Sequence, residues 1–360
     1  MKLIAQVKLN TTPEQFDALR LTLETVNDAA SFISDFVWDN KIFRQYDIHK
    51  AQYYIIKERF NLSAQIVVRV TAKVADAYKL DKKTKRTFSK HGSISFDSRI
   101  LSWKLDKKII SIWSMAGRLK IPFLAGPKQL EMLKSLQGEA DLVLRDGAFY
   151  IHQVCDIPES PEFKPDGFMG VDFGIVEIAS TSSGKSFSGN ELKGRRARNL
   201  KLRRKLQKKG TKSAKRLLKL RRRKESRFSK DVNHCISKQI VVDAERTNQA
   251  VVLEDLKGIR ERVRVKKNRR HLHHSWPFDE LKRFIIYKAK RSGVPLIIVD
   301  PRNSSRECSV CHCIAKRNRK SQSVFSCISC GFSANADSNA SLNLSYRGRL
   351  AVNQAIVVSA

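Results

Sequence analysis

The sequence predicts an α/β domain that carries a four-cysteine insertion, preceded by a small β-barrel that a helical segment interrupts. Three observations lead to this prediction. Short β-rich segments separated by turn residues follow one another between residues 82 and 157, as in a small barrel. Apolar runs that bear or end on an acid stand at Asp172 and Glu254. Two Cys-x-x-Cys pairs follow within residues 308–330.

Length and charge narrow the class of protein. With 360 residues, the chain can bury more than one hydrophobic core. It has 70 lysines and arginines against 35 acids, a formal net charge of +35. This surplus indicates a polyanionic partner, and nucleic acid fits better than a membrane because no long apolar or amphipathic anchor is visible. The N-terminal apolar run is too short for a signal peptide, so we expect a cytoplasmic protein with reduced thiols.

The N-terminal part begins with a strand and continues in helices. Residues 2–9 alternate apolar and polar side chains, the period of a strand with one buried face. Thr12 can cap the next segment and Pro13 suits a first helical position, so the apolar stripe that follows predicts a long helix. Two further helices are expected at residues 49–60 and 63–79.

Six short strands are expected after these helices. The dipeptide Asp146-Gly147 is a hairpin turn signal between the last two strands. A stretch with three prolines then indicates a linker into the second half of the chain. The expected strands cover residues 94–96, 99–103, 108–113, 117–122, 140–145 and 148–155.

Three carboxylates suggest a shared site. Asp172 stands in an apolar run that Gly174 interrupts, which predicts a hairpin with a carboxylate on a central strand. Glu254 ends a β-branched run, and a lone ionised acid in such strands is costly without a metal or a partner. Asp337 begins a helix-compatible stretch, where the helix dipole alone would also account for an acid. Together the three are typical of a site for two Mg²⁺ ions that hydrolyses a phosphodiester.

The cysteine pairs predict one tetrahedral Zn²⁺ site. Cys308, Cys311, Cys327 and Cys330 have the spacing at which two tight turns aim four thiolates at one ion. Disulfides or free core thiols are the alternatives, and the lack of a secretory signal argues against disulfides. The neighbouring His312 and Cys313 leave the ligand set open, with Cys313 as the first substitute.

A strongly basic segment follows the first acid. Residues 193–230 hold twenty lysines and arginines and one acid, Glu225, interleaved with leucines. A solvated pair of charged helices is one interpretation, but its self-repulsion favours contact with a nucleic-acid backbone. A second basic stretch spans residues 260–270. The arginines expected to contact nucleic acid are Arg195, Arg196, Arg203, Arg204, Arg221, Arg222, Arg223, Arg269 and Arg270.

Four motifs in order carry a family resemblance: GVDFGI at 170–175, VVLEDLKGIRER at 251–262, the paired cysteines, and ADSNASLN at 336–343. Residues 165–345 resemble the RuvC-type nuclease domain of the TnpB family, which insertion sequences encode and which is similar to type V CRISPR effectors. The chain departs from the family at His312, where a glycine is usual, and at Phe173, where an aliphatic residue is commoner.

The resemblance implies an RNase H-like fold and an RNA-guided DNA endonuclease. By this resemblance, Asp172, Glu254 and Asp337 are catalytic and bind two Mg²⁺ ions, or Mn²⁺, while one Zn²⁺ is structural. A guide RNA from the element's end would pair with one strand of a double-stranded DNA target. The single nuclease site would cut both strands, and we favour a monomer.

The N-terminal half would read a short motif beside the target, by the same resemblance. Gln65, Arg69 and Lys73 lie four residues apart, hence on one helix face, and suit contacts to base edges or phosphates. Tyr53 and Tyr54 on the preceding helix suit stacking or phosphate contact. A solvated helix face is the alternative interpretation.

Two functions other than an RNA-guided endonuclease remain open. An RNA-guided regulator that acts by occupancy is one alternative, although the three carboxylates argue against it. A DDE-type transposase that joins strands is the other, because such enzymes share this fold and metal chemistry.

The expected domain segments are a barrel (wedge) domain of 1–10 and 80–157, a helical recognition insertion of 11–79, a linker of 158–166, a nuclease domain of 167–303 and 333–348, a zinc-binding insertion of 304–332 that contacts target nucleic acid, and a C-terminal tail of 349–360.

Overall fold

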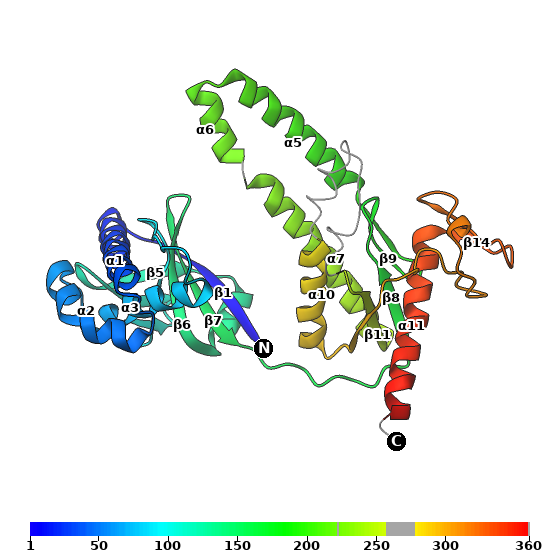
Figure 1. The fold of residues 1–360 in the computed structure, drawn as a ribbon, viewed down its shortest axis with the longest axis horizontal. Helices are drawn as coiled ribbons and strands as arrows, with labels where there is room; N and C mark the ends of the chain where they lie inside the picture. The colour runs from blue at the N-terminus through cyan, green and yellow to red at the C-terminus, as the bar shows by residue number, and fades with distance from the viewer. Residues whose placement is uncertain (222, 257–277, 359–360) are drawn as a thin grey trace. The chain divides into compact units, whose positions relative to one another are not determined.

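A computed structural model describes residues 1–221, 223–256 and 278–358 of the chain. They form two compact units, Met1–Pro158 and Glu159–Ala360. Figure 1 shows the elements of each unit. Within the described ranges, no helix has the length and apolar character needed to cross a membrane.

The first unit is built on a seven-stranded antiparallel sheet in the order β2-β6-β7-β1-β5-β4-β3. The sheet is barrel-like and nearly closed, which confirms the barrel that the short strands predicted. β1 lies at its centre, paired with β7 on one side and β5 on the other. The strands are β1 (Lys2–Leu9), β2 (Ile94–Phe96), β3 (Leu101–Lys104), β4 (Ile109–Ser114), β5 (Gly117–Leu124), β6 (Leu136–Arg145) and β7 (Ala148–Asp156).

Three helices stand between β1 and β2 in the chain. They are α1 (Pro13–Asn40), α2 (Gln45–Phe60) and α3 (Ala64–Leu80). The predicted cap Thr12 is part of a capping box: the Gln15 amide donates to Thr12 Oγ1, and the Thr12 amide donates to Gln15 Oε1. α2 begins four residues before the predicted start, and the short helix α4 (Pro127–Leu133) was not predicted.

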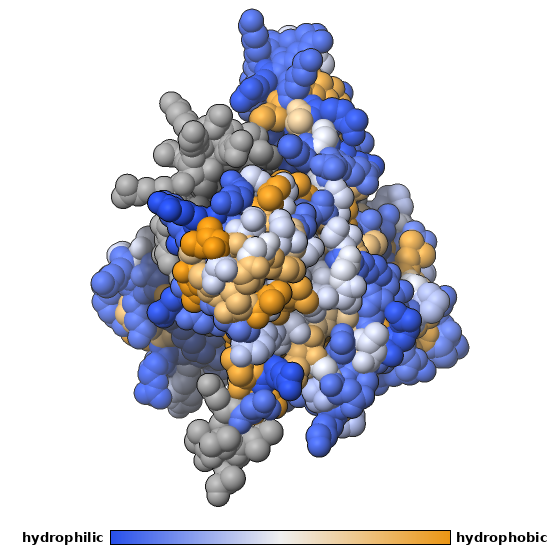
Figure 2. All heavy atoms as spheres, turned by 90° about the vertical axis from the view of Figure 1, so that its right-hand side faces the viewer, coloured by the Kyte–Doolittle hydropathy of each residue, from blue (hydrophilic) through white to orange (hydrophobic). Residues whose placement is uncertain are grey.

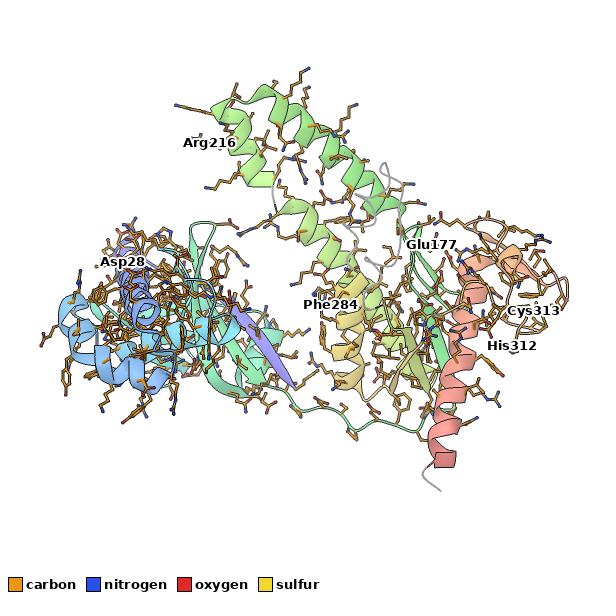
Figure 3. All side chains as sticks on the ribbon, viewed as in Figure 1. Asp28, Glu177, Arg216, Phe284, His312 and Cys313 are labelled. Atoms are coloured by element: carbon orange, nitrogen blue, oxygen red, sulfur yellow. The ribbon has the colours of Figure 1, made fainter. Side chains whose placement is uncertain are left out.

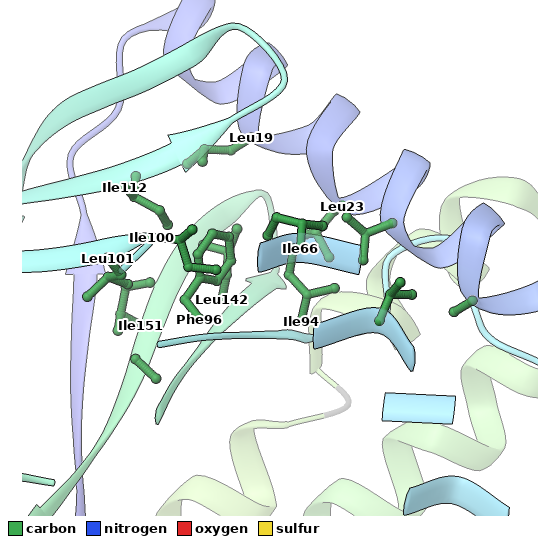
Figure 4. Packing of buried hydrophobic residues seen from close by; sticks show 14 of the residues in the cluster. Leu19, Leu23, Ile66, Ile94, Phe96, Ile100, Leu101, Ile112, Leu142 and Ile151 are labelled. Atoms are coloured by element: carbon green, nitrogen blue, oxygen red, sulfur yellow. The ribbon is translucent and has the colours of Figure 1, made fainter. Parts of the chain in front are cut away.

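The helices and the sheet of this unit share one hydrophobic core. Figure 4 shows Leu19 and Leu23 of α1 and Ile66 of α3 packed beside Phe96 and Ile151 of the sheet. All five side chains are buried. Alternation along the strands and the 3.6-residue period along the helices aim apolar side chains at this core, and their burial stabilises the unit.

The second unit contains a five-stranded sheet in the order β10-β9-β8-β11-β12. β8, β11 and β12 are parallel, whereas β8, β9 and β10 pair antiparallel. The predicted hairpin after Asp172 is the β8–β9 pair. The strands are β8 (Gly167–Asp172), β9 (Glu177–Thr181), β10 (Ser186–Ser188), β11 (Gln249–Glu254) and β12 (Leu296–Val299).

Helices cover both faces of this sheet (Figure 1). α7 (Lys224–Arg246) and α10 (Phe278–Ser292) pack in one core with β8, β9 and β11. α11 (Ala336–Val358) lies on the other face against β8. The approach is so close that a Cβ atom at Gly170 would lie 2.0 Å from the Ser341 carbonyl oxygen, so only glycine fits in the GVDFGI motif at this position.

The remaining elements project from the sheet. α5 (Asn190–Lys209) and α6 (Lys212–Arg221) form the basic segment between β10 and α7. Residues 304–335, here termed the cysteine lobe, contain a short helix η1 (Lys316–Asn318) and the hairpin of β13 (Val324–Ser326) and β14 (Ser333–Asn335). The lobe has a small core of its own around Phe325 and leads directly into α11.

Candidate active site

The structure brings the three predicted carboxylates to one edge of the second sheet. Asp172 is the last residue of β8, and Glu254 is the last residue of β11. Because Val171 pairs with Leu253 in a parallel ladder, both acids lie at the same edge. Asp337 stands in the first turn of α11. Burial raises the pKa of Asp172 well above its usual range, and the charges of Glu254 and then Asp337 raise it further.

Glu254 is held from several sides. Its side chain is 7% exposed, and burial raises its pKa. The hydroxyl of Ser304 donates to its Oε1 over 2.7 Å, and this bond and the charge of Arg347 oppose the rise. Lys282 Nζ donates to the Glu254 carbonyl oxygen over 3.2 Å, which fixes the end of β11.

Asp337 owes its position to the cysteine lobe. The side chain of Asn335, the last residue of β14, accepts hydrogen bonds from the amides of Asp337 (2.9 Å) and Ser338 (3.2 Å) and so caps α11. Burial raises the pKa of Asp337, and the guanidinium of Arg319, 3.4 Å from Oδ1, opposes this rise. The sequence pattern gave no signal for Arg319 or Ser304, because their contacts join segments far apart in the chain.

These carboxylates fit hard divalent cations by their donor type and by their electrostatics. Oxygen ligands suit Mg²⁺, and a cation would offset the burial and the repulsion that raise the pKa of Asp172. Among the described residues, only the cysteines form a group whose ligand atoms all lie within 4.8 Å of one another. The carboxylate oxygens of the three acids are therefore spread more widely than the four sulfurs.

The four predicted cysteines form that close group. Cys308 Sγ and Cys330 Sγ are 3.7 Å apart, and Cys311 Sγ and Cys327 Sγ are 3.5 Å apart. These distances exceed the ~2.05 Å of a disulfide and match the roughly 3.8 Å between thiolates around one zinc ion. Backbone amides of Cys330 and Ser329 lower the pKa of Cys327 to about 6, which favours a thiolate. The geometry therefore suggests a zinc site.

His312 and Cys313 lie outside this group of four. Figure 3 labels both residues in the cysteine lobe. His312 Nδ1 lies 3.0 Å from Glu307 Oε1, and its ring stacks on Tyr346 with centroids 4.3 Å apart. Its φ of 58° is left-handed, like the 74° of Gly331 after the second cysteine pair. A glycine is the unstrained residue there, and the contacts of the imidazole hold His312 in this conformation.

The predicted arginine contacts fall into different groups. Arg203 and Arg204 are exposed on α5, as is Arg195, whose guanidinium lies 3.7 Å from the ring centroid of Phe228. Arg223 is exposed, and Arg221 is half-buried and donates to Asn199. Arg222, Arg269 and Arg270 lie outside the described residues.

Arg196 differs from the other arginines because it is only 8% exposed. It lies 3.7 Å from Glu225 and donates to Ser229 over 3.4 Å. These contacts join α5 to α7, so they give Arg196 a packing role in place of the predicted surface contact. Figure 3 shows, by contrast, the side chain of Arg216 pointing outward from α6.

The predicted face of α3 is turned toward the sheet of its unit. Gln65 donates to Asp97, and Arg69 donates to Glu139. Lys73 donates to Asn27 Oδ1 (2.6 Å) and to the Ser93 carbonyl oxygen (2.8 Å), and burial lowers its pKa to about 8. The three residues share one face as predicted, but any nucleic-acid contact would compete with these partners. On α2, Tyr54 is 73% exposed, and its ring meets that of Tyr53 edge to face.

Apolar residues are also exposed on the cysteine lobe. Val310 is 60% exposed, and Ile314 and Ile328 are each 55% exposed. Figure 2 faces this side of the second unit and shows apolar side chains among polar ones.

The fold is that of the Cas12 effectors. In the Cas12f1–sgRNA–target DNA complex, the Cas12f1 chain superposes with a TM-score of 0.59 at 16% identity, covering 91% of this chain and 82% of that one. Residues 278–344 match the family described as "Cas12f1-like, TNB domain".

Sequence relatives are named as nucleases and TnpB-like proteins. Cas12f1, a CRISPR-associated endodeoxyribonuclease of Sulfoacidibacillus thermotolerans, is 37% identical over 34% of this chain and 28% of its own length. A TnpB-like protein of Methanocaldococcus jannaschii is 36% identical over 34% of this chain and 43% of its own length. InsQ of Escherichia coli, a putative RNA-guided DNA endonuclease, is 28% identical over 55% of this chain and 53% of its own length. The matched part of the chain thus spans about a quarter to a half of the length of these relatives. Their names confirm the predicted resemblance to the TnpB family.

Proposed function

We propose that this protein is an RNA-guided DNA endonuclease of a transposable element, which cuts DNA beside a short target-adjacent motif. One observation carries the proposal: three acids from two strands and a helix meet at one sheet edge, where burial and then the charges of Glu254 and Asp337 raise the pKa of Asp172. Relatives named as RNA-guided or CRISPR-associated endonucleases supply the reaction class.

The chemistry follows from the residues at this edge. Asp172, Glu254 and Asp337 would hold Mg²⁺, which when bound polarises a phosphodiester and activates water. The protein itself would supply these largely buried acids at the edge of an RNase H-like sheet. Arg319 favours the ionised form of Asp337 from the cysteine lobe, against the burial that raises its pKa, and Ser304 holds one oxygen of Glu254.

The remaining parts are assigned roles in binding. A guide RNA and double-stranded DNA would lie along the exposed arginines of α5 and α6, since counterion release favours such contacts. The cysteine lobe would bind one structural zinc, and the wedge and recognition segments at 1–10, 11–79 and 80–157 would read the flanking motif. Sequence discrimination would come mainly from base pairing with the guide.

A cleavage assay with RNA-loaded protein tests this function. Asp172→Ala, Glu254→Ala and Asp337→Ala should each abolish Mg²⁺-dependent cutting while leaving guided DNA binding largely intact, because each removes one ligand of a shared site. Asp279→Asn, at an exposed acid of α10, is the matched control and should cut normally. Appreciable cutting by any one alanine variant would remove that residue from the site.

Two other outcomes would replace the proposal. Guided binding without cutting by the wild-type protein would indicate a regulator that acts by occupancy. Joining of marked donor DNA to the target would indicate a strand-transfer transposase. Sequencing the RNA that copurifies with the protein provides the guide for all three arms of this experiment.

A further inference from the structure

We propose that Ser304 is a positioning residue for Glu254, and that this serine couples the cysteine lobe to the carboxylate site. The inference rests on the proposed function and adds to it. The cysteine lobe is joined to Asp337 by the backbone, because α11 follows the lobe directly. Glu254 lies on β11, so the lobe reaches it only through side-chain contacts such as that of Ser304.

The contact between the two side chains is buried and short. Ser304 is 5% exposed and Glu254 is 7% exposed. The Ser304 hydroxyl lies 2.7 Å from Glu254 Oε1 and 3.1 Å from the carbonyl oxygen of Pro301. A hydroxyl has one proton, and the shorter distance to a charged acceptor assigns that proton to the carboxylate. With one oxygen held in this way, the orientation of the other oxygen toward a cation is fixed.

Ser304 is itself fixed by α11. The side-chain amide of Asn343 donates to the carbonyl oxygens of Ser304 (2.9 Å) and Glu307 (2.7 Å). Asn339, also on α11, donates to the Glu307 carbonyl oxygen (2.8 Å) and accepts from the Ser309 amide (3.0 Å). Both asparagines are fully buried. The segment 304–309, which contains Cys308 of the first cysteine pair, is therefore hydrogen-bonded to α11, the helix with Asp337 in its first turn.

This arrangement links two of the three acids through one segment. Asn339 lies two residues after Asp337, so its bonds tie the start of α11 to the 304–309 segment. Ser304 then ties the segment to the end of β11. The separation between Glu254 and Asp337 thus depends on the segment, and so does the affinity of the site for a divalent cation. Removing a hydrogen bond that orients a metal ligand lowers metal affinity by about 10- to 100-fold.

Mn²⁺ binding measured by electron paramagnetic resonance on the full chain tests this role without requiring cleavage. Asp172→Ala identifies which bound Mn²⁺ belongs to the carboxylate site. Ser304→Ala should weaken that binding about tenfold. Ser304→Thr, which keeps the hydroxyl, should restore it, and Ser305→Ala, at the half-buried neighbour, should bind as the wild type does. In the cleavage assay, Ser304→Ala should raise the half-saturating Mg²⁺ concentration about tenfold, with a smaller effect on the rate at saturating Mg²⁺.

Zinc content and the melting temperature separate positioning from a merely structural role. Weakened Mn²⁺ binding with zinc retained and a melting temperature near that of the wild type supports the proposal. Unchanged Mn²⁺ affinity in Ser304→Ala overturns it, and so does loss of zinc together with unfolding, since Ser304 would then only hold the lobe in place. If the wild type binds Mn²⁺ but does not cut guided DNA, the proposed endonuclease fails while this inference is still decided by the binding arm.

Discussion

Arg319 of the cysteine lobe places a guanidinium nitrogen 3.4 Å from Oδ1 of Asp337, the acid in the first turn of α11. Its positive charge lowers the pKa of Asp337 and of Asp172, against the burial that raises both. The lobe that holds the cysteines thus also sets the charge of the carboxylate site.

Replacing Arg319 should shift the pH dependence of cleavage. Without the guanidinium, the pKa values of Asp337 and Asp172 rise further, so both acids stay protonated to higher pH. Metal binding needs ionised carboxylates, and the acidic limb of the Mg²⁺-dependent rate should therefore move to higher pH in Arg319→Ala. Arg319→Lys should shift it less. Rates across a pH series measure this, with Arg317→Ala, at an exposed neighbour, as the control. An unshifted limb in Arg319→Ala would contradict the electrostatic role.

Asp172→Asn should stabilise the metal-free protein while abolishing cleavage. Because the pKa of Asp172 is raised in the folded state, its contribution to stability is lost as pH rises above the unfolded value of 3.8. Asparagine has a similar shape and no charge, so the cost at neutral pH disappears. We expect the melting temperature to rise by about 2–4 °C, which corresponds to about 1 kcal/mol for a unit of this size. Thermal unfolding in a chelator measures the effect. Asp279→Asn should not change it, and an equal or lower melting temperature in Asp172→Asn would show that the buried, repelled charge of Asp172 does not destabilise the folded protein.

Removal of the cysteine ligands should release zinc and loosen the second unit. The variant Cys308→Ser/Cys327→Ser takes one thiolate from each close pair of sulfurs. The rest of the unit has its own large core, so we expect the lobe and the start of α11 to lose order without global unfolding. Metal analysis should find about one zinc per wild-type chain and none in the variant. Cys313→Ser is the matched control and should keep its zinc, and zinc retained by the double variant would rule out this ligand set.

Substitutions on α3 separate motif reading from domain packing. Gln65→Ala should relax preference at one motif position, with a cost of roughly 1–3 kcal/mol for a paired contact to a base. The ion pair of Arg69 with Glu139 adds a second expectation, because Arg69→Ala should also lower the melting temperature of the first unit. Lys73→Ala should weaken DNA binding to the same extent for all motif variants if the lysine contacts a phosphate.

A randomised-flank cleavage library measures these motif preferences. Lys79→Ala, at an exposed lysine of the same helix, serves as the control. If motif preferences and activity are unchanged in all three variants, the residues that recognise the motif would lie on the barrel strands instead.

The basic helices should contribute to the salt dependence of binding. Arg203→Ala/Arg204→Ala should flatten the slope of log affinity against log salt by about one for each phosphate that the arginines no longer neutralise. Arg196→Ala should instead lower the melting temperature, because it removes a buried partner of Glu225. Titrations at several salt concentrations measure the slope. An unchanged slope in the double variant would show that α5 is a solvated helix.

Most elements of the fold followed from local pattern. The alternation at residues 2–9 predicted β1, and Thr12 and Pro13 predicted where α1 begins. Terminal acids on apolar runs predicted the ends of β8 and β11, and the spacing of the cysteines predicted the group of four. These features depend on residues a few positions apart, where backbone period and metal geometry act directly.

The tertiary structure decided which polar groups meet. The sequence did not distinguish the buried Arg196 from the exposed Arg195, nor show that Gln65 and Arg69 face acids of their own unit. Ser304 reaches Glu254 across 50 positions of the chain and Arg319 reaches Asp337 across 18. Such pairs form only when strands and helices pack, because packing brings distant segments within hydrogen-bond range and removes the water that would otherwise solvate them. The sequence alone therefore determined the acids and thiolates that define this protein, while the orientation and charge state of those acids came from contacts that only the folded chain contains.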